Sequence, residues 1–194
     1  LASDTVARRR FIQGMLAYCR DNGFDGVDYD WEHPVDANEM EQYGTLVSET
    51  QAAFGPKGLL VTVAQAGWQD VGRRVYEAVD LIHLMSYDQD FPQATLAAAA
   101  AEIDSLTAWG CPPAKIALGL PFYGRDKERK ARTYAELVGD GPVDPASDII
   151  DGFAFNGRST LGAKISLAHK RGLGGVMVWE LGQNTHSREA SLLS

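Results

Sequence analysis

The sequence has few of the residues that mark disulfide scaffolds, nucleic-acid-binding proteins or membrane proteins. Its 194 residues include only two cysteines, Cys19 and Cys111, which lie far apart and have no cysteine or histidine neighbours at metal-ligand spacing. Basic residues form no dense cluster, and the formal charge of −8 suits a neutral polymer better than a polyanion as partner. No apolar run reaches membrane-spanning length, and no signal-peptide pattern opens the sequence. We therefore expect one soluble domain that binds neither nucleic acid nor membrane.

Four carboxylates fall within the eight positions of residues 25–32, Asp-Gly-Val-Asp-Tyr-Asp-Trp-Glu, in a segment that otherwise reads as a buried strand. Side chains alternate along a strand, and neighbours on one face are roughly 7 Å apart. The two faces carry Asp28, Asp30 and Glu32 on one side, and Val27, Tyr29 and Trp31 on the other. Burying charged carboxylates is costly, and close like charges push their pKa values apart. One acid can then stay protonated beside an anionic neighbour, as cleavage of a glycosidic bond requires.

Two other interpretations of this acidic segment remain open. Asp-x-Asp-x-Glu offers the oxygen ligands that magnesium or calcium prefers, so the segment could bind a divalent metal. It could also be a solvated loop, although its apolar alternate positions argue against that. We predict catalytic carboxylates, with no metal and no cofactor.

Apolar runs typical of strands alternate with helical patterns along the chain. The predicted strands are 25–32, 59–66, 80–87, 115–122 and 175–181. The predicted helices are 4–22, which Asp4 would cap and Gly23 would end, 39–54, 94–109 and 160–171. This alternation predicts an α/β fold with a parallel sheet covered by helices. No repeat or linker interrupts it, so residues 1–194 form one predicted domain.

The acidic segment resembles the DxxDxDxE signature of glycoside hydrolase family 18, the chitinase family. Its four acidic positions are Asp25, Asp28, Asp30 and Glu32. Three later segments also resemble the family: Met85–Asp88 its Met-x-Tyr-Asp strand end, Gly119–Arg125 its seventh strand, and Gly174–Glu180 its eighth. Four ordered matches across residues 11–184 make the resemblance specific, whereas a single Asp-x-Asp would be weak.

The resemblance implies a (β/α)₈ TIM barrel with its active site at the carboxyl ends of the strands. Only five strands are recognisable, similar to the family's fourth to eighth, so we expect a partial barrel: a piece of a longer gene product, or a half-barrel completed by another chain, with self-association possible. Residues 126–158 are too few for the α+β domain that many relatives insert between strands 7 and 8. We therefore expect an open cleft that suits cutting within a polymer. Val61, Val63, Leu84 and Val178 are predicted to face the barrel interior.

The resemblance also implies a substrate-assisted, retaining mechanism, an exception to the usual two-carboxylate scheme. Glu32 would protonate the leaving oxygen, and the carbonyl of the substrate's 2-acetamido group would attack the anomeric carbon. Asp30 would orient that acetamido group, and Asp28 would share charge or a proton with Asp30. Tyr87 would donate its hydroxyl to the acetamido oxygen. Glu32 would then act as base on a water molecule.

Further residues are predicted by the resemblance to contact the sugar. Trp179 would form the floor under the cleaved unit, and the other predicted contacts are Met85, Asp88, Tyr123 and Arg125. Trp68 fits an aromatic subsite and a core position equally well. Structural roles are predicted for Asp25, Trp109 and all four histidines: His33, His83, His169 and His186.

The sequence thus predicts a chitinase-like, endo-acting hydrolase of β-1,4-linked N-acetylglucosamine polymers, secreted or extracellular by resemblance. An endo-β-N-acetylglucosaminidase or a peptidoglycan-type hydrolase of the same family would carry the same acids in a different cleft. A chitin-binding lectin on the same barrel typically lacks the catalytic glutamate, whereas Glu32 is present here. If the acidic segment instead binds a catalytic metal ion, a chelator should abolish the activity.

Overall fold

A computed structural model describes residues 1–139 and 143–193. Its central element is a five-stranded parallel sheet in the order β1-β2-β3-β4-β9, with β1 and β9 at the edges. The strands are β1 (Gly26–Tyr29), β2 (Leu60–Ala66), β3 (Leu81–Met85), β4 (Ile116–Pro121) and β9 (Gly175–Trp179). All five predicted strands are present. The first is shorter than predicted, so Asp30 and Glu32 lie beyond its carboxyl end.

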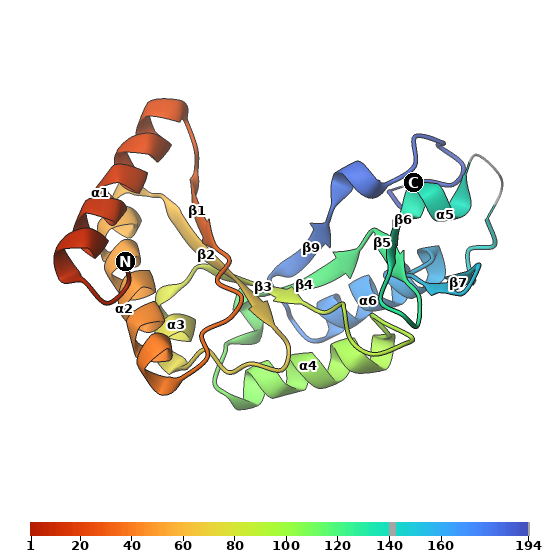
Figure 1. The fold of residues 1–194 in the computed structure, drawn as a ribbon, viewed down its shortest axis with the longest axis horizontal. Coiled ribbons are helices and arrows are strands. Elements are labelled where there is room, and N and C mark those ends of the chain that lie inside the picture. The colour runs from red at the N-terminus through yellow and green to blue at the C-terminus, as the bar shows by residue number, and fades with distance from the viewer. Residues whose placement is uncertain (140–142, 194) are drawn as a thin grey trace.

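Five helices, one before β1 and four in the connections between the strands, lie along one side of the sheet, whereas the opposite side carries none of them (Figure 1). They are α1 (Thr5–Asn22), α2 (Ala37–Phe54), α3 (Arg73–Ala78), α4 (Leu96–Ala108) and α6 (Arg158–Lys170). Three short 3₁₀ helices are η1 (Gly55–Lys57), η2 (Pro113–Lys115) and η3 (Leu181–Gln183). The predicted ends of α1 are confirmed: the Asp4 carboxylate accepts from two backbone N–H groups of the first turn, and Gly23 ends the helix at φ +71°. The short helix α3 was not predicted.

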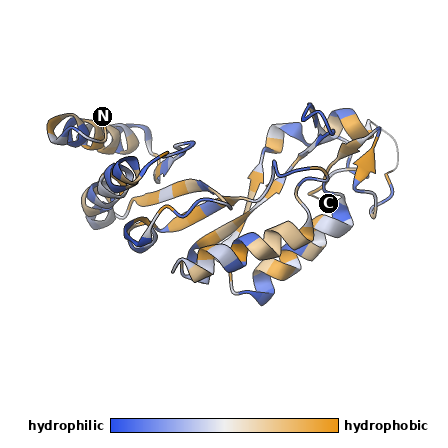
Figure 2. Ribbon diagram, turned by 60° about the horizontal axis from the view of Figure 1, so that its bottom comes forward, coloured by the Kyte–Doolittle hydropathy of each residue, from blue (hydrophilic) through white to orange (hydrophobic). Residues whose placement is uncertain are grey.

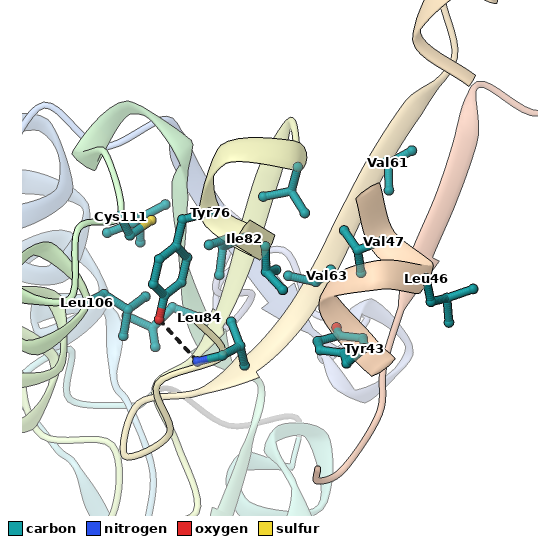
Figure 3. Close-up of a cluster of buried hydrophobic side chains, with 14 of the residues drawn as sticks. Tyr43, Leu46, Val47, Val61, Val63, Tyr76, Ile82, Leu84, Leu106 and Cys111 are labelled. Carbon is teal, nitrogen blue, oxygen red and sulfur yellow. Dashed lines mark hydrogen bonds between the residues drawn. The ribbon is translucent and has the colours of Figure 1, made fainter. Parts of the chain in front are cut away.

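The core lies between the sheet and its helices. Figure 2 shows apolar residues along the strands of the parallel sheet and both apolar and polar residues along the long helices. Figure 3 shows the largest cluster, in which Val61, Val63 and Leu84 from the strands are fully buried with Val47 of α2 and Leu106 of α4. Burial of side chains of this size is worth about 1.5–3 kcal/mol each before the entropy cost of folding.

The prediction that four valine and leucine side chains face the barrel interior is wrong. Val61, Val63 and Leu84 pack toward the helices, and Val178 packs against Leu120 and Phe122 in the cluster with α6. Strands of parallel sheets are commonly apolar on both faces, so alternation alone does not identify which face meets the helices. Polar groups identify the other face: Asp28 lies there with Thr62 and His83.

A small antiparallel sheet follows β4, and beyond the motif Gly119–Arg125 the sequence predicted no element there. Its order is β6-β5-β8-β7, and its members are β5 (Tyr123–Arg125), β6 (Ala131–Thr133), β7 (Ile149–Ile150) and β8 (Phe153–Ala154), with helix α5 (Tyr134–Val138). Tyr134 and Leu137 pack with Phe153 and Phe155 in a separate apolar cluster. Strands of two or three residues are too short to show an alternating pattern, which explains why sequence analysis missed them.

Candidate active site

A cavity of about 560 Å³ opens at the carboxyl ends of the five parallel strands. Nine of the ten predicted site residues line it: Asp30, Glu32, Trp68, Met85, Tyr87, Asp88, Tyr123, Arg125 and Trp179. They come from four strand ends and the small sheet, because the carboxyl ends of parallel strands meet at one edge of the sheet. The tenth, Asp28, lies two residues before Asp30, within β1, and alternation places it on the same face.

Asp28 lies within the sheet and is held by two polar neighbours. Its Oδ1 accepts a hydrogen bond from Thr62 Oγ1 at 2.5 Å, and His83 Nδ1 lies 3.2 Å from the same oxygen. Burial acts to raise the pKa of Asp28, but the hydrogen bonds of His83 and Thr62 outweigh it and leave the pKa below its ordinary value. This environment therefore favours the ionised form of Asp28. The proton sharing with Asp30 that the resemblance implies stays a prediction.

Glu32 has the opposite electrostatic setting. Desolvation raises its pKa above the ordinary value, and the negative charge of nearby Asp30 raises it further. His33 Nε2 lies 3.7 Å from a Glu32 carboxylate oxygen. About half of the Glu32 side chain is exposed (52%), so the carboxyl group is accessible from the cavity. Glu32 can thus hold a transferable proton where a substrate can reach it.

Tyr87 and Asp88 lie just beyond the end of β3 and line the same cavity as Asp30 and Glu32. Burial and the charges of Asp88, Asp30 and Glu32 raise the pKa of Tyr87, which keeps its hydroxyl a donor. Its ring meets the Tyr123 ring edge-on, with centroids 6.0 Å apart.

The Asp88 carboxylate is engaged by protein groups on both oxygens. Tyr123 donates its hydroxyl to Oδ1 at 2.7 Å, and Arg125 donates to Oδ1 through Nε and to Oδ2 through Nη2, the latter at 2.9 Å. The Asp88 N–H donates to the Gln93 amide oxygen at 3.0 Å. A bidentate arginine contact fixes both partners. These three residues therefore form one rigid unit at the wall of the cavity.

Two tryptophans expose their rings at the cavity. Trp179, at the end of β9, is 50% exposed, and Trp68, after β2, is 69% exposed. Trp68 meets the His33 ring edge-on at 4.9 Å between centroids. The exposure of Trp68 decides between the two alternatives for this residue, because a core tryptophan would be buried. Trp109 packs partly buried against the main core, as predicted.

The sequence analysis missed several residues of the cavity wall. The missed polar residues are His33, Gln89, Glu102, Arg129, Arg132, Thr133, Glu136 and Gln183. Arg129, Arg132, Thr133 and Glu136 belong to the small sheet and its connections, which had no recognisable pattern. The structural roles predicted for His33 and His83 are incomplete, because both lie beside acids of the site. The acid beside His83 comes from another strand, so sequence spacing gave no signal, whereas His33 directly follows Glu32 and its role was simply not recognised.

Within residues 1–139 and 143–193, no three histidine, cysteine, aspartate or glutamate side chains are grouped so that they could hold a metal ion. No helix in these ranges is long and apolar enough to cross a membrane.

The profile of glycosyl hydrolases family 18 matches residues 1–184. The chain belongs to this family. Among curated proteins, probable chitinase 2 of Drosophila melanogaster is 30% identical over 165 residues, which cover 73% of this chain and 34% of that protein. The family resemblance inferred from the four motifs is therefore confirmed.

Solved structures of the family superpose closely on this fold. The GH18 chitinase ChiB from the chitin utilization locus of Flavobacterium johnsoniae superposes with a TM-score of 0.87 at 26% identity. The match covers 100% of this chain and 65% of ChiB. The chitinase-like agglutinin of Robinia pseudoacacia has a TM-score of 0.84 at 25% identity, over 95% of this chain and 71% of the agglutinin. Other neighbours are chitinases in complex with N-acetylglucosamine oligomers. The α/β class is confirmed, and the chain spans about two thirds of these structures.

Proposed function

We propose that this chain carries the acids of a chitinase-like glycosidase that cleaves β-1,4 bonds between N-acetylglucosamine units. The observation that carries the proposal is Glu32, an accessible carboxyl group of raised pKa beside Asp30, in a cavity at the strand ends of a family 18 fold. The chitinase relatives and the neighbours bound to N-acetylglucosamine oligomers support the substrate class.

In the proposed reaction, Glu32 gives its proton to the glycosidic oxygen as the bond to the anomeric carbon breaks. The acetamido carbonyl oxygen of the same sugar donates an electron pair to that carbon, and a cyclic oxazolinium ion forms. The anionic Glu32 then takes a proton from a water molecule whose oxygen opens the ring from the same face. Two inversions leave the configuration retained.

The neighbours of Glu32 suit the cation that forms. Asp30 is placed to orient the acetamido N–H and to stabilise the positive charge, and the Tyr87 hydroxyl is a donor for the acetamido oxygen. Asp28, ionised within the sheet, adds negative charge behind Asp30. Trp179 offers an exposed ring to the sugar face, and the Asp88–Tyr123–Arg125 unit offers fixed polar groups. Met85 and Trp68 complete the proposed contacts.

The proposed mechanism predicts that activity depends on the ionisation of Glu32. Glu32 is competent as an acid only while protonated, so kcat/KM should fall as the pH rises through its raised pKa. The alkaline limb should therefore lie above the ordinary pKa of a glutamate. A pH series of initial rates on a chitin oligosaccharide measures it. An alkaline limb at the ordinary glutamate pKa would contradict this electrostatic account.

A second prediction tests the nucleophile. De-N-acetylated oligomers should bind but resist cleavage wherever glucosamine precedes the scissile bond, because the attacking carbonyl is missing. A thiazoline analogue of the cyclic intermediate should inhibit, since it resembles a state that the site stabilises. Product analysis by mass spectrometry measures both effects. Cleavage after glucosamine, or an ester trapped on Asp30, would point to a carboxylate nucleophile instead.

The agglutinin among the neighbours favours a second candidate, a lectin that binds chitin oligomers without cleaving them. Binding of a chitin oligomer without any hydrolysis by the protein would favour this lectin. Relatives that act on N-glycan cores or peptidoglycan-type sugars would be recognised by product analysis on those substrates.

We also propose that the five strands are the fourth to eighth strands of an eight-stranded barrel. The sheet ends at β1 and β9 without closing, and Val176 on β9 is 41% exposed. Closure would cover both edges, which are otherwise prone to pair with other chains. The missing strands would come from the same gene product or from another copy. The sheet after β4 is small, which suits an open, endo-acting cleft. An extracellular site of action stays a prediction of the family resemblance.

A further inference from the structure

His83 has no part in the reaction described above, although it points to the same side of the sheet as the acids. In the parallel ladder it pairs with Ala64 of β2 and Ala117 of β4, so its imidazole shares a face with these small side chains. On its own strand, Met85 and then Tyr87 continue this face toward the cavity. His83 therefore lies one layer below the residues that would meet the sugar, as Asp28 lies below Asp30.

The lower layer contains one acid with two donors. Thr62 and His83 converge on the same oxygen, Asp28 Oδ1, at 2.5 Å and 3.2 Å. A proton placed on this oxygen would displace both contacts, so the two donors favour the ionised carboxylate. Side-chain exposure of 27% for His83 and 40% for Asp28 leaves both groups partly shielded from water.

No competing partner faces the imidazole among the described residues of the sheet. The residues that share its face on the adjacent strands and on β3 itself are Thr62, Ala64, Ala66, Leu81, Met85, Ala117 and Gly119, and Tyr87 follows just beyond β3. Tyr87 is the one titratable group among them, and its raised pKa keeps it uncharged. Asp28, two strands away on β1, is the charged group that His83 contacts. The contact spans β2 because the intervening Ala64 side chain is small.

We propose that His83 is a positioning residue of this site: it donates its Nδ1–H to Asp28 and holds that carboxylate ionised and fixed. The resemblance implies that Asp28 shares either charge or a proton with Asp30; this contact favours the sharing of charge, and the transferable proton stays with Glu32. This inference rests on the proposed glycosidase function. It deepens that proposal by naming the residue that keeps Asp28 ionised beneath Asp30.

Two substitutions of His83 separate a donor from a mere space-filler. His83→Leu removes the N–H, whereas His83→Gln retains an N–H donor of similar reach. Because a hydrogen bond to a charged group is lost, kcat on a chitin oligosaccharide should fall by about tenfold or more in His83→Leu, with KM little changed. His83→Gln should recover most of that loss. Equal losses in both variants, or a change confined to KM, would overturn the positioning role.

An NMR measurement of the His83 tautomer tests the contact with Asp28 independently of enzymatic turnover. In protein labelled with ¹⁵N-histidine, long-range ¹H–¹⁵N spectra distinguish the two neutral tautomers, and His83→Gln identifies the resonance of this residue. The contact requires the Nδ1–H tautomer, and Asp28→Ala should abolish that preference. A neutral His83 protonated at Nε2 in the parent protein would refute the proposal. If the tautomer is as expected but no chitin oligomer is cleaved, the proposed function fails while the His83–Asp28 contact stands.

His169 provides a matched control. It lies exposed near the end of α6, away from the acids. His169→Gln should change neither kcat nor the His83 resonance, so an effect there would show that the measured changes are not specific to the site.

Discussion

Glu32→Gln should reduce hydrolysis of a chitin oligomer by roughly 10²-fold or more, the scale of lost general acid catalysis. The amide keeps the size and most of the hydrogen-bonding reach of the carboxyl group, but it has no proton to transfer. Single-turnover and steady-state rates on a defined oligosaccharide measure the loss.

Binding should survive the same substitution. Trp179, Tyr87 and the Asp88–Tyr123–Arg125 unit are unchanged by it, so calorimetry should give an oligomer affinity close to that of the parent. Glu77→Gln on α3 provides the control, because Glu77 is exposed and pairs with Arg73 outside the cavity. It should retain full activity. Comparable turnover in Glu32→Gln and the parent protein would remove Glu32 from its assigned role.

Comparison of Glu32→Gln with the parent protein also distinguishes an enzyme from a lectin. A lectin would bind the oligomer equally in the parent and in Glu32→Gln and would hydrolyse it in neither. An enzyme of the proposed kind loses turnover in Glu32→Gln alone.

Residue pattern alone predicted the parts of the fold that are long or chemically unusual. The five parallel strands and the four long helices have periodic apolar positions, and Asp4 and Gly23 mark both ends of α1 by local chemistry. The acids of residues 25–32 were recognisable because burying a charged side chain inside a sheet costs free energy. These signals depend on near neighbours in the sequence, which is why they could be read without a structure.

Contacts between distant segments could not be predicted in this way. The inward face was assigned wrongly for Val61 and Val63, because both faces of β2 are largely apolar or small. Trp68 could be placed at the cavity only once its exposure was known. The contact of His83 with Asp28 depends on the order β1-β2-β3 and on the small residue between them, neither of which is visible in spacing.

The motifs that identified the family filled part of this gap. Residue pattern alone showed only that Tyr123 and Arg125 lie near the end of a strand, and the family motif marked them as sugar contacts. Both line the cavity and donate hydrogen bonds to the Asp88 carboxylate. Arg129 and Arg132 follow within the next few residues and line the same cavity. No motif included them, and they were missed.

The second large effect is expected from the open sheet. Produced alone, residues 1–194 should be insoluble, oligomeric or inactive, because three of eight barrel strands and their substrate contacts are absent if the proposed barrel is correct. Figure 1 shows the side of the sheet that closure would cover, opposite the helices. The edges β1 and β9 would offer unpaired backbone groups to other chains.

Sizing chromatography with light scattering, run beside an assay on a fluorogenic chitobiose derivative, measures this expectation. The matched comparison is the complete gene product: if it supplies the missing strands, it should be a soluble, active monomer. An active oligomer of residues 1–194 would instead favour completion of the barrel by a second copy. A soluble, active monomer of 21.1 kDa would show that five strands form a working site, and the argument from barrel closure would be wrong.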